Sequence, residues 1–312
     1  MTKRNSGHNQ VENVALIFNE MVGEYDNLCD LWYRYTFGSI DEVLLSNFPL
    51  LRNANPKPIA LDIGCGTGIQ SLRLASMGYK VIGVDIADEL LKVARKKLLK
   101  AGYIDAEFYN IDAQSLPFSD NIADCVNCCG PTLSFIPDWR KALSEMARCL
   151  KLGGKLLLEV EGKWNFDLFW EIVNGFGCNF LEYDEPLFTA LSHLLPPWDK
   201  GHIINYSFKL ESGQTVPMRL KLFSAKELTR ELQKVGLIIE KRWGLHVLTN
   251  LIPSTILHKP NPSRPLQKLF NRLASIEKRF NRFWPFSSFG CSLLVLACKV
   301  EQKTKQKGGP DG

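Results

Sequence analysis

Hydrophobic and polar residues alternate along the middle of the chain in a rhythm that predicts strands and helices in turn. Short apolar runs predict seven strands, at 59–63, 79–85, 106–110, 125–129, 155–160, 237–243 and 292–300. Apolar positions at helical spacing predict helices at 69–77, 88–101, 139–150 and 224–235. Strands that alternate with helices imply a mostly parallel sheet with helices on both faces. We therefore expect an α/β fold with a doubly wound, seven-stranded sheet whose last strand is antiparallel.

The segments around this repeat follow other patterns. Apolar residues between Val14 and Phe37 recur at helical spacing and predict two or three helices over 11–48. An inserted stretch combines an aromatic-rich helix at 164–176 with a hairpin, 203–210 and 216–223, around a Ser-Gly turn. The predicted division is a helical cap at 1–57, a core at 58–161, an inserted substrate-pocket region at 162–223, the rest of the core at 224–301 and a disordered tail at 302–312. Residues 1–10 are expected to form a second polar tail.

Helix-capping signals sharpen three boundaries. Asp88 is the expected N-cap of the helix at 88–101, and Ser224 with Glu227 forms a capping box for the helix at 224–235. The pair Gly153-Gly154 is expected to separate the helix at 139–150 from the next strand.

Composition narrows the class of protein. The chain has 312 residues, of which 45% are hydrophobic and 23% charged, so it can bury a large core and wholesale disorder is excluded. A formal net charge of +5 does not require a nucleic-acid partner, and we expect none. Nine cysteines, an odd number, and a polar N-terminus predict free thiols in a reducing cytoplasm. No apolar window approaches the roughly 18 residues that span a bilayer.

A glycine-rich turn carries the strongest chemical signal. The run from Leu61 to Gly68 reads LDIGCGTG and joins a predicted strand to a predicted helix. Glycines let the backbone turn sharply and approach a ligand closely, and ligands of open α/β sheets bind beyond the carboxyl ends of the strands. The dinucleotide fingerprint needs a third glycine where Ile69 stands, which disfavours a NAD-dependent oxidoreductase.

Three acids follow three successive strands. Asp62 precedes the glycines, where a carboxylate suits a cationic ligand and would repel a pyrophosphate. Asp85 ends the second strand, where it can accept hydrogen bonds from both ribose hydroxyls of a nucleoside. Asp112 follows the third strand and can accept from an adenine amino group, with the Ala113 N–H directed to a ring nitrogen. This constellation predicts a site for a positively charged nucleoside.

These motifs resemble the class I S-adenosylmethionine (SAM)-dependent methyltransferases over about residues 14–160. The glycine motif, the ribose acid and the adenine acid of that family match 62–68, Asp85 and Asp112, and 124–129 and 146–155 match its fourth-strand and pre-fifth-strand patterns. The stretch from Phe18 to Asp26 resembles the start of quinone-biosynthesis C-methyltransferases, in which a Tyr-Asp pair helps a cap close over the cofactor, whereas 162–257 departs from that branch. The resemblance implies methyl transfer from SAM and a cofactor site formed by Tyr25, Asp62, Gly64, Cys65, Gly66, Gly68, Asp85, Ile86, Asp112, Ala113 and Cys129.

Candidate bases lie outside these motifs. A base is needed only if the acceptor must lose a proton. His193 and His202 flank a rigid apolar segment and are the predicted catalytic residues, and His246 is a further candidate. Glu159 and Glu161 follow the fifth strand and are interpreted as solvated strand ends, with a role at the site as the alternative.

The pair Cys125 and Cys128 has the spacing of some metal ligands. Residues three apart on a strand point to opposite faces, and no second pair with zinc spacing follows. We therefore predict no metal site.

Aromatic residues suggest what the acceptor is. Those expected near the pocket mouth are Trp32, Tyr33, Trp164, Phe166, Phe169, Trp170 and Trp198. They favour a small, apolar or aromatic acceptor such as a quinone, polyketide or lipid-like molecule. The alternatives are an RNA or protein methyltransferase and a non-catalytic binding partner with the same fold. An amphipathic helix at 265–283 with a basic face is interpreted as packed on the sheet, and peripheral membrane contact is the alternative.

Overall fold

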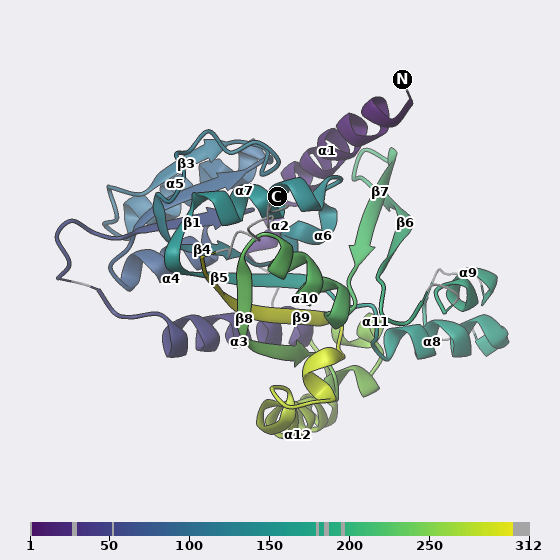
Figure 1. The fold of residues 1–312 in the computed structure, drawn as a ribbon. Helices are drawn as coiled ribbons and strands as arrows, with labels where there is room; N and C mark the ends of the chain where they lie inside the picture. Colours follow the sequence, from purple (N-terminus) through teal and green to yellow (C-terminus); the bar gives the residue numbers. More distant parts are fainter. Residues whose placement is uncertain are drawn as a thin grey trace, which may run out of the picture.

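The structure is a computed structural model that describes residues 2–26, 30–51, 53–178, 181–183, 187–194 and 197–301. At its centre lies a seven-stranded sheet in the order β3-β2-β1-β4-β5-β9-β8 (Figure 1). The strands are β1 (Ile59–Ile63), β2 (Lys80–Asp85), β3 (Glu107–Asn110), β4 (Ala123–Cys128), β5 (Leu150–Glu161), β8 (Leu237–Leu245) and β9 (Ser292–Lys299). β1 to β5 pair in parallel, whereas β9 is antiparallel to both β5 and β8. The predicted α/β sheet with an antiparallel last strand is confirmed.

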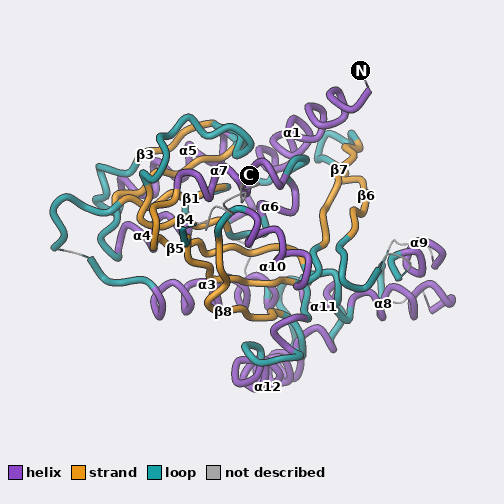
Figure 2. Tube along the Cα trace, viewed as in Figure 1, coloured by secondary structure: helices purple, strands orange, loops and turns teal. Residues whose placement is uncertain are grey.

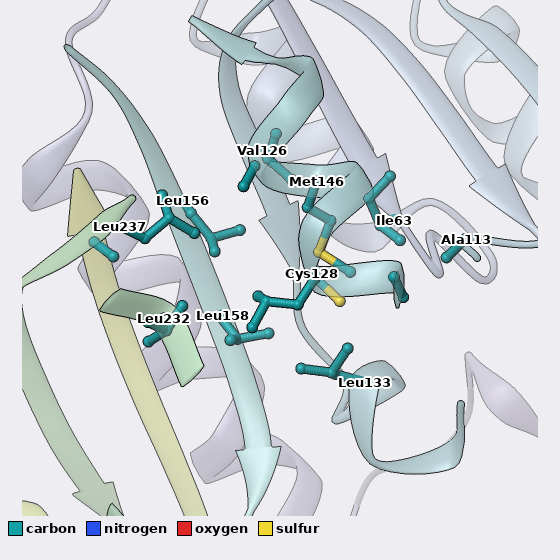
Figure 3. Packing of buried hydrophobic residues seen from close by; sticks show 14 of the residues in the cluster. Ile63, Ala113, Val126, Cys128, Leu133, Met146, Leu156, Leu158, Leu232 and Leu237 are labelled. Atoms are coloured by element: carbon teal, nitrogen blue, oxygen red, sulfur yellow. The ribbon is translucent and has the colours of Figure 1, made fainter. Parts of the chain in front are cut away.

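Helices cover both faces of this sheet, because successive side chains of a strand point to opposite sides. Leu156 and Leu158 of β5 belong to one buried cluster, together with residues of α6 (Thr132–Phe135), α7 (Trp139–Cys149) and α10 (Ala225–Lys234) (Figure 3). Leu157, between them, belongs to the opposite cluster with residues of α3 (Leu31–Asn47), α4 (Ile69–Ser76) and α5 (Asp88–Lys100). The two-residue period of β5 thus defines which helices share a face.

The N-terminal helix packs against a hairpin that stands apart from the central sheet (Figure 2). The hairpin consists of β6 (His202–Lys209) and β7 (Thr215–Leu222), close to the predicted ranges. α1 (Thr2–Glu20) inserts Val14 and Ile17 against Val216 and Met218 of β7, and the short α2 (Val22–Tyr25) follows it. The Gln10 amide accepts from the Arg219 N–H at 3.0 Å and donates to the Arg219 carbonyl at 2.9 Å. Far-separated segments therefore form one unit at this edge.

The remaining helices are short, with the exception of the long helix that follows α11. The inserted region holds α8 (Asp167–Val173), the π-helical turn η1 (Asn174–Cys178) and α9 (Leu187–Ser192). After β8 come η2 (Thr249–Leu251), α11 (Ser254–Leu257), α12 (Arg264–Phe280) and η3 (Phe286–Ser288). α12 packs on α3, where the ring of Tyr35 lies edge-on to Phe270 and its hydroxyl donates to Glu277 at 2.9 Å. The amphipathic helix therefore packs on α3, and its C-cap Asn281 accepts from the Gly244 N–H of β8 at 3.0 Å.

Several predicted boundaries were wrong. Helix α1 begins at Thr2, so the described part of 1–10 is helical and not an unstructured tail. Strand β5 begins directly after α7 and runs through Gly153 and Gly154, because β4 pairs with it as far back as Leu150. Ala87, not Asp88, is the N-cap of α5. The predicted tail at 302–312 lies outside the described residues.

The sequence predicted no segment long and apolar enough to span a bilayer. Within the described ranges, no helix is both long enough and apolar enough to cross a membrane.

Candidate active site

The glycine turn after β1 is built by close packing. Gly64, Gly66 and Gly68 have φ values of +68°, +52° and +78°, in the left-handed region that disfavours residues with a side chain. A Cβ atom on Gly64 would lie 2.2 Å from Thr132 Oγ1, and one on Gly68 would lie 3.0 Å from Ala94 Cβ. Helices α5 and α6 therefore press on the turn from two sides, and only glycine fits between them.

Asp85 at the end of β2 organises this turn. One carboxylate oxygen accepts from the Gly66 N–H at 2.8 Å, and the other accepts from the Ala87 N–H at 2.8 Å. Burial raises the pKa of Asp85, although these backbone hydrogen bonds oppose the increase. Each carboxylate oxygen has a second lone pair, so Asp85 can also accept from a ligand hydroxyl.

Asp112 holds the other end of the same cavity. It lies just after β3 and accepts from the Gln114 N–H at 2.9 Å and from the Gln114 side-chain amide at 2.7 Å. Ile111, next to it, donates its N–H to the Asp85 carbonyl at 3.1 Å. The loops after β2 and β3 are thus held to each other, and the two acids face one pocket.

The first cavity holds about 680 Å³ of open space beside these loops. Residues of the predicted cofactor site that line it are Gly64, Gly66, Asp85, Ile86, Asp112 and Ala113. Val11, Val14 and Phe18 of α1 cover it from one side, and Gly130, Thr132 and Phe135 close it from another. Sequence reasoning missed the last three, although they directly follow the fourth strand, where ligands of α/β sheets bind.

Four predicted cofactor residues lie behind the cavity wall. Gly68, Cys65 and Cys129 support the turn and do not line the cavity. Asp62 is 1% exposed and accepts from Ser71 Oγ at 2.5 Å and from the Asn127 amide at 2.8 Å. Burial raises its pKa to about 6, against the lowering effect of those two hydrogen bonds. In this structure, Asp62 ties the glycine turn to α4 and β4.

The N-terminal cap reaches the glycine turn through Asp26. Its carboxylate accepts from Thr67 Oγ1 at 2.6 Å and pairs with Lys97 Nζ at 2.9 Å. The side chain of Tyr25, the other member of the expected Tyr-Asp pair, lies outside the described residues.

A second cavity of about 1250 Å³ adjoins the first. The two share Phe18, Gly130 and Phe135 in their walls. One side of the second cavity is aromatic, with Trp32, Tyr33 and Phe37 of α3. Polar and ionisable groups also line it, and these are Glu159, Glu161, Lys163, Asp167, Glu171, His193, His202 and His258. The second cavity is where the methyl acceptor predicted from the sequence would bind, because it adjoins the first.

The two predicted catalytic histidines meet in this second cavity. The rings of His193 and His202 lie 4.9 Å apart, and His193 Nδ1 is 3.9 Å from a Glu171 carboxylate oxygen. Both ring nitrogens of His202 are buried without a hydrogen-bond partner among the described residues. Burial, and then His193, Lys163 and Lys221, lower the pKa of His202 to about 4. His202 is therefore a neutral imidazole at neutral pH.

His246 does not belong to either cavity. It is fully buried, its ring stacks on Trp32 at 3.7 Å, and its nitrogens contact the hydroxyls of Thr36 at 2.9 Å and Thr249 at 3.1 Å. Burial lowers its pKa to about 3. The interpretation of His246 as a base was wrong, since packing with α3 makes it a core residue.

The expected aromatic mouth is only partly present. Of the seven aromatic residues named for it, Trp32 and Tyr33 line the second cavity. The indole N–H of Trp164 donates to the Trp198 carbonyl and that of Trp170 to the Asn250 carbonyl, while Phe169 and Trp198 are exposed. The Trp164 contact lies within the inserted region, whereas the Trp170 contact joins this region to η2. The second cavity is consequently more polar than the sequence indicated.

The expectation that Cys125 and Cys128 point to opposite faces is confirmed. Cys125 belongs to the cluster on the α3 side of the sheet and Cys128 to the cluster on the α7 side. Burial raises the pKa of both thiols. Across the part of the chain that is described, no group of three or more potential ligands is arranged to hold a metal ion.

Comparison with known proteins identifies relatives of this chain. Residues 61–158 match the family described as methyltransferase domain. The ubiquinone/menaquinone biosynthesis C-methyltransferase UbiE of Teredinibacter turnerae is 33% identical over 165 residues, which cover 48% of this chain and 59% of that protein. The protein of the same name from Marinomonas sp. is 31% identical over 188 residues, which cover 55% and 68%. The chain thus spans less than two thirds of the first relative's length.

The fold also occurs in solved structures. The [4+2]-cyclase SpnF superposes with a TM-score of 0.56 at 16% identity, covering 93% of this chain and 96% of that protein. At this identity the likeness extends to the fold alone, and one fold can carry several chemistries.

Proposed function

Because the chain belongs to the class I SAM-dependent methyltransferases, we propose that it transfers the SAM methyl group to a small-molecule acceptor held in the second cavity. The observation that carries this proposal is the shared wall of the two cavities, formed by Phe18, Gly130 and Phe135. Two ligands bound in these adjoining cavities would approach each other beside the three shared residues. Methyl transfer requires such a meeting in a pocket that excludes water.

The residues of the first cavity fit a nucleoside cofactor. The backbone of Gly64 and Gly66 lines the first cavity, and Asp85 has lone pairs left for the ribose hydroxyls. Ile86 and Ala113 line the adenine side next to Asp112. When bound, SAM supplies an electrophilic methyl group on a sulfonium centre. The protein's own contribution is to orient the acceptor against that group and to keep water out.

Four further residues support the proposed cofactor site without lining the cavity, and Tyr25 is added to them. Asp62, Cys65, Gly68 and Cys129 hold the glycine turn and the end of β4 in place, and Asp62 adds negative charge near the position expected for a cationic ligand. Tyr25 is retained in this site on the resemblance of the Tyr-Asp pair.

The second cavity suggests the class of acceptor. Trp32, Tyr33 and Phe37 offer a surface for an aromatic or other apolar ring, whereas His193 and His202 face it with polar atoms. An aromatic acceptor with a proton-bearing polar group matches both sides. The names of the UbiE relatives, which act in ubiquinone and menaquinone biosynthesis, agree with a quinone-like ring.

A lipid-like acceptor would place the protein at a membrane, and α12 supports this possibility. Leu269, Ile276 and Phe280 of this helix are 46–49% exposed, although the sequence places them on its apolar side. The basic residues Lys268, Arg272 and Arg279 are exposed beside them. Exposed apolar residues flanked by cations are typical of helices that bind anionic lipid surfaces. We therefore propose a cytoplasmic protein with peripheral membrane contact through α12.

Calorimetry on the purified chain tests the cofactor site. SAM and its demethylated product, S-adenosylhomocysteine (SAH), should both bind. Asp85→Asn should weaken both about tenfold, because one charged hydrogen-bond acceptor is lost. Asp88→Asn is the matched control, since Asp88 lies three residues away, pairs with Lys92 at 3.4 Å and does not line the cavity. No binding of either ligand to the folded chain would contradict the proposal.

Label transfer tests the acceptor class. Radiolabelled SAM incubated with the protein and a cell extract should label the lipid or small-molecule fraction. Label confined to RNA or protein would support the alternative of a macromolecular methyltransferase. Binding of SAM without any labelled product would support a non-catalytic partner with this fold.

A further inference from the structure

Strand β5 brings two carboxyl groups into the second cavity. Glu159 and Glu161 are two residues apart on β5, so both project from the same face of the sheet, the face that carries α3. Both line the second cavity. Glu159 accepts from the Gly130 N–H at 2.7 Å, and Gly130 lines both cavities. Glu159 therefore stands at the junction of the two cavities, and Glu161 lies two residues further along the wall of the second.

Neither carboxyl group is fully satisfied by the protein. Glu159 is 0% exposed, and its second oxygen, Oε1, makes no hydrogen bond of ordinary geometry to a described residue, although the Ser292 side chain lies close enough to lower the pKa of the carboxyl group. The Glu161 carboxyl group is also without a hydrogen bond from any described residue, although it lies within the cavity. A buried acceptor atom without a partner is costly. Such atoms point to a proton or a ligand that the pair is built to hold.

A third acid of the second cavity, Asp167, differs from this pair because hydrogen bonds from the protein fill its carboxylate. Asp167 accepts from the Tyr183 hydroxyl, from the Asn250 amide at 3.0 Å and from the Ser254 N–H at 3.1 Å. These partners hold α8 to η2 and to the start of α11. Asp167 therefore adds fixed negative charge near Glu161 and has little capacity left for an acceptor.

We propose that Glu161 is the group that takes the acceptor's proton during methyl transfer, and that Glu159, held by the Gly130 N–H, is the neighbouring acid that sets how tightly Glu161 holds a proton. This inference rests on the proposed function. For an acceptor X–H, an X–C bond forms, the S–C bond breaks with its electron pair passing to sulfur, and the X–H proton moves to the Glu161 carboxylate. Glu161 is then the catalytic residue, and His202 binds the acceptor as a neutral imidazole.

Electrostatics explains why the carboxyl group is the better base. Burial, then Glu159 and Asp167, raise the pKa of Glu161 to about 8, whereas His202 titrates near 4. A general base works best when its pKa lies near the working pH. The cavity therefore reverses the ordinary order, in which a histidine is more basic than a glutamate.

The surrounding ionisable groups are consistent with this reversal. The acids around the pair are Asp167 and Glu171 of α8, which add negative charge. The basic groups that line the cavity are Lys163, His193, His202 and His258, of which Lys163 donates to two backbone carbonyls and His258 pairs with Asp30. Burial raises the pKa of Tyr33, Cys129 and Cys291, so these groups stay protonated. The raised pKa of about 8 means that Glu161 is expected to gain or lose a proton near pH 8.

Proton release on ligand binding provides a test that needs no acceptor. SAM carries a positive sulfonium and SAH a neutral sulfur, so SAM alone should lower the pKa of a nearby carboxyl group. Calorimetric titrations in buffers of different ionisation enthalpy count the protons released by each ligand. At pH 8 we expect SAM to release about 0.5 proton per site more than SAH. In Glu161→Gln this difference should vanish while SAH still binds.

Two matched variants separate Glu161 from its neighbours. Glu171→Gln removes another acid of the same cavity, and His202→Gln removes the unpartnered imidazole. Both should retain the difference between SAM and SAH. The inference is overturned if the wild type binds both ligands with equal proton release, or if the difference persists in Glu161→Gln or disappears in His202→Gln.

The wild-type protein alone keeps the test decisive if Glu161→Gln does not fold. The difference in proton release, followed from pH 5 to pH 10, should be largest between about pH 7 and pH 8. A maximum near pH 5 would assign the proton to a histidine and overturn the inference. Failure of the wild type to bind both ligands would instead remove the proposed function, and this inference with it.

Discussion

At the scale of single residues, Gly64 shows how one position serves both the fold and the site. Its φ of +68° is strained for any residue with a side chain, and an added Cβ atom would also meet Thr132. Gly102, by contrast, has a φ of +88° but nothing within 4 Å of an added Cβ atom. The two glycines therefore separate backbone strain from steric contact.

Gly102→Ala should lower the free energy of unfolding by about 1–2 kcal/mol, the cost of a left-handed conformation, and leave SAM binding unchanged. Gly64→Ala should lower the free energy of unfolding by more than that and should also weaken SAM binding. The reason is that α6, whose Thr132 lines the first cavity, must move away from the added methyl group. Urea denaturation and calorimetry measure the two effects. Equal stability losses in the two variants would contradict the role of the Thr132 contact.

The titration of Glu161 has a consequence for stability. Its pKa is raised from an ordinary 4.5 to about 8, so the folded chain holds this proton more tightly than the unfolded chain does. Its stabilising contribution is fully present below about pH 4.5 and is lost as the pH rises through about 8. Glu161→Gln carries no such proton, so its Tm relative to the wild type should increase between pH 5 and pH 9.

Thermal denaturation across this pH range checks the prediction. Glu240→Gln, which removes an exposed carboxylate of β8 that pairs with Lys155 of β5 across the intervening β9, is the control and should show no comparable trend. A Glu161→Gln curve parallel to the wild type at every pH would show that Glu161 titrates normally.

At the scale of elements, α1 covers the first cavity and is held by the hairpin of β6 and β7. The buried Gln10 side chain pairs with both backbone groups of Arg219, whereas Asn13 on the same helix makes one exposed hydrogen bond to the Pro217 carbonyl. Because Val11, Val14 and Phe18 of α1 line the cofactor cavity, docking of this helix and cofactor binding should reinforce each other.

Gln10→Ala should therefore weaken SAM binding about tenfold and speed its release, because a buried pair of hydrogen bonds that docks α1 is lost. Asn13→Ala should have a much smaller effect, since water replaces an exposed hydrogen bond. Stopped-flow displacement of SAM by SAH measures the rates. Equal release rates in the two variants would mean that the hairpin does not hold α1 over the cofactor.

At the scale of the whole molecule, the distribution of exposed apolar residues predicts how the protein meets a membrane. The overall charge is +5, and α12 combines exposed Ile276 and Phe280 with exposed cations. The double variant Ile276→Ser with Phe280→Ser should reduce co-sedimentation with anionic vesicles severalfold, and salt should weaken what remains.

Ile104→Ser provides the control for this experiment, because Ile104 is 82% exposed in the loop between α5 and β3, and β3 lies away from α12 (Figure 1). It should leave vesicle binding unchanged. If the wild type does not sediment with anionic vesicles, α12 has no membrane role and a soluble acceptor becomes the better proposal.

Much of the molecule follows from local sequence alone. The two-residue and helical periods predicted all seven strands of the sheet, and the glycine turn with Asp85 and Asp112 predicted the lining of the first cavity. These features depend on backbone conformation and on residues near each other along the chain, which a pattern can express. The ends of elements were less accurate, as at Thr2 and Leu150, because packing partners far along the chain decide where a helix or strand stops.

Only the tertiary structure decided which polar groups face a ligand. Asp62 turns inward to Ser71 and Asn127, His246 stacks in the core, and Glu161 becomes more basic than His202. Burial and the charges around a group set its pKa. The groups responsible come from α3, β5, β6 and α8, which are distant in sequence and meet only when the chain folds.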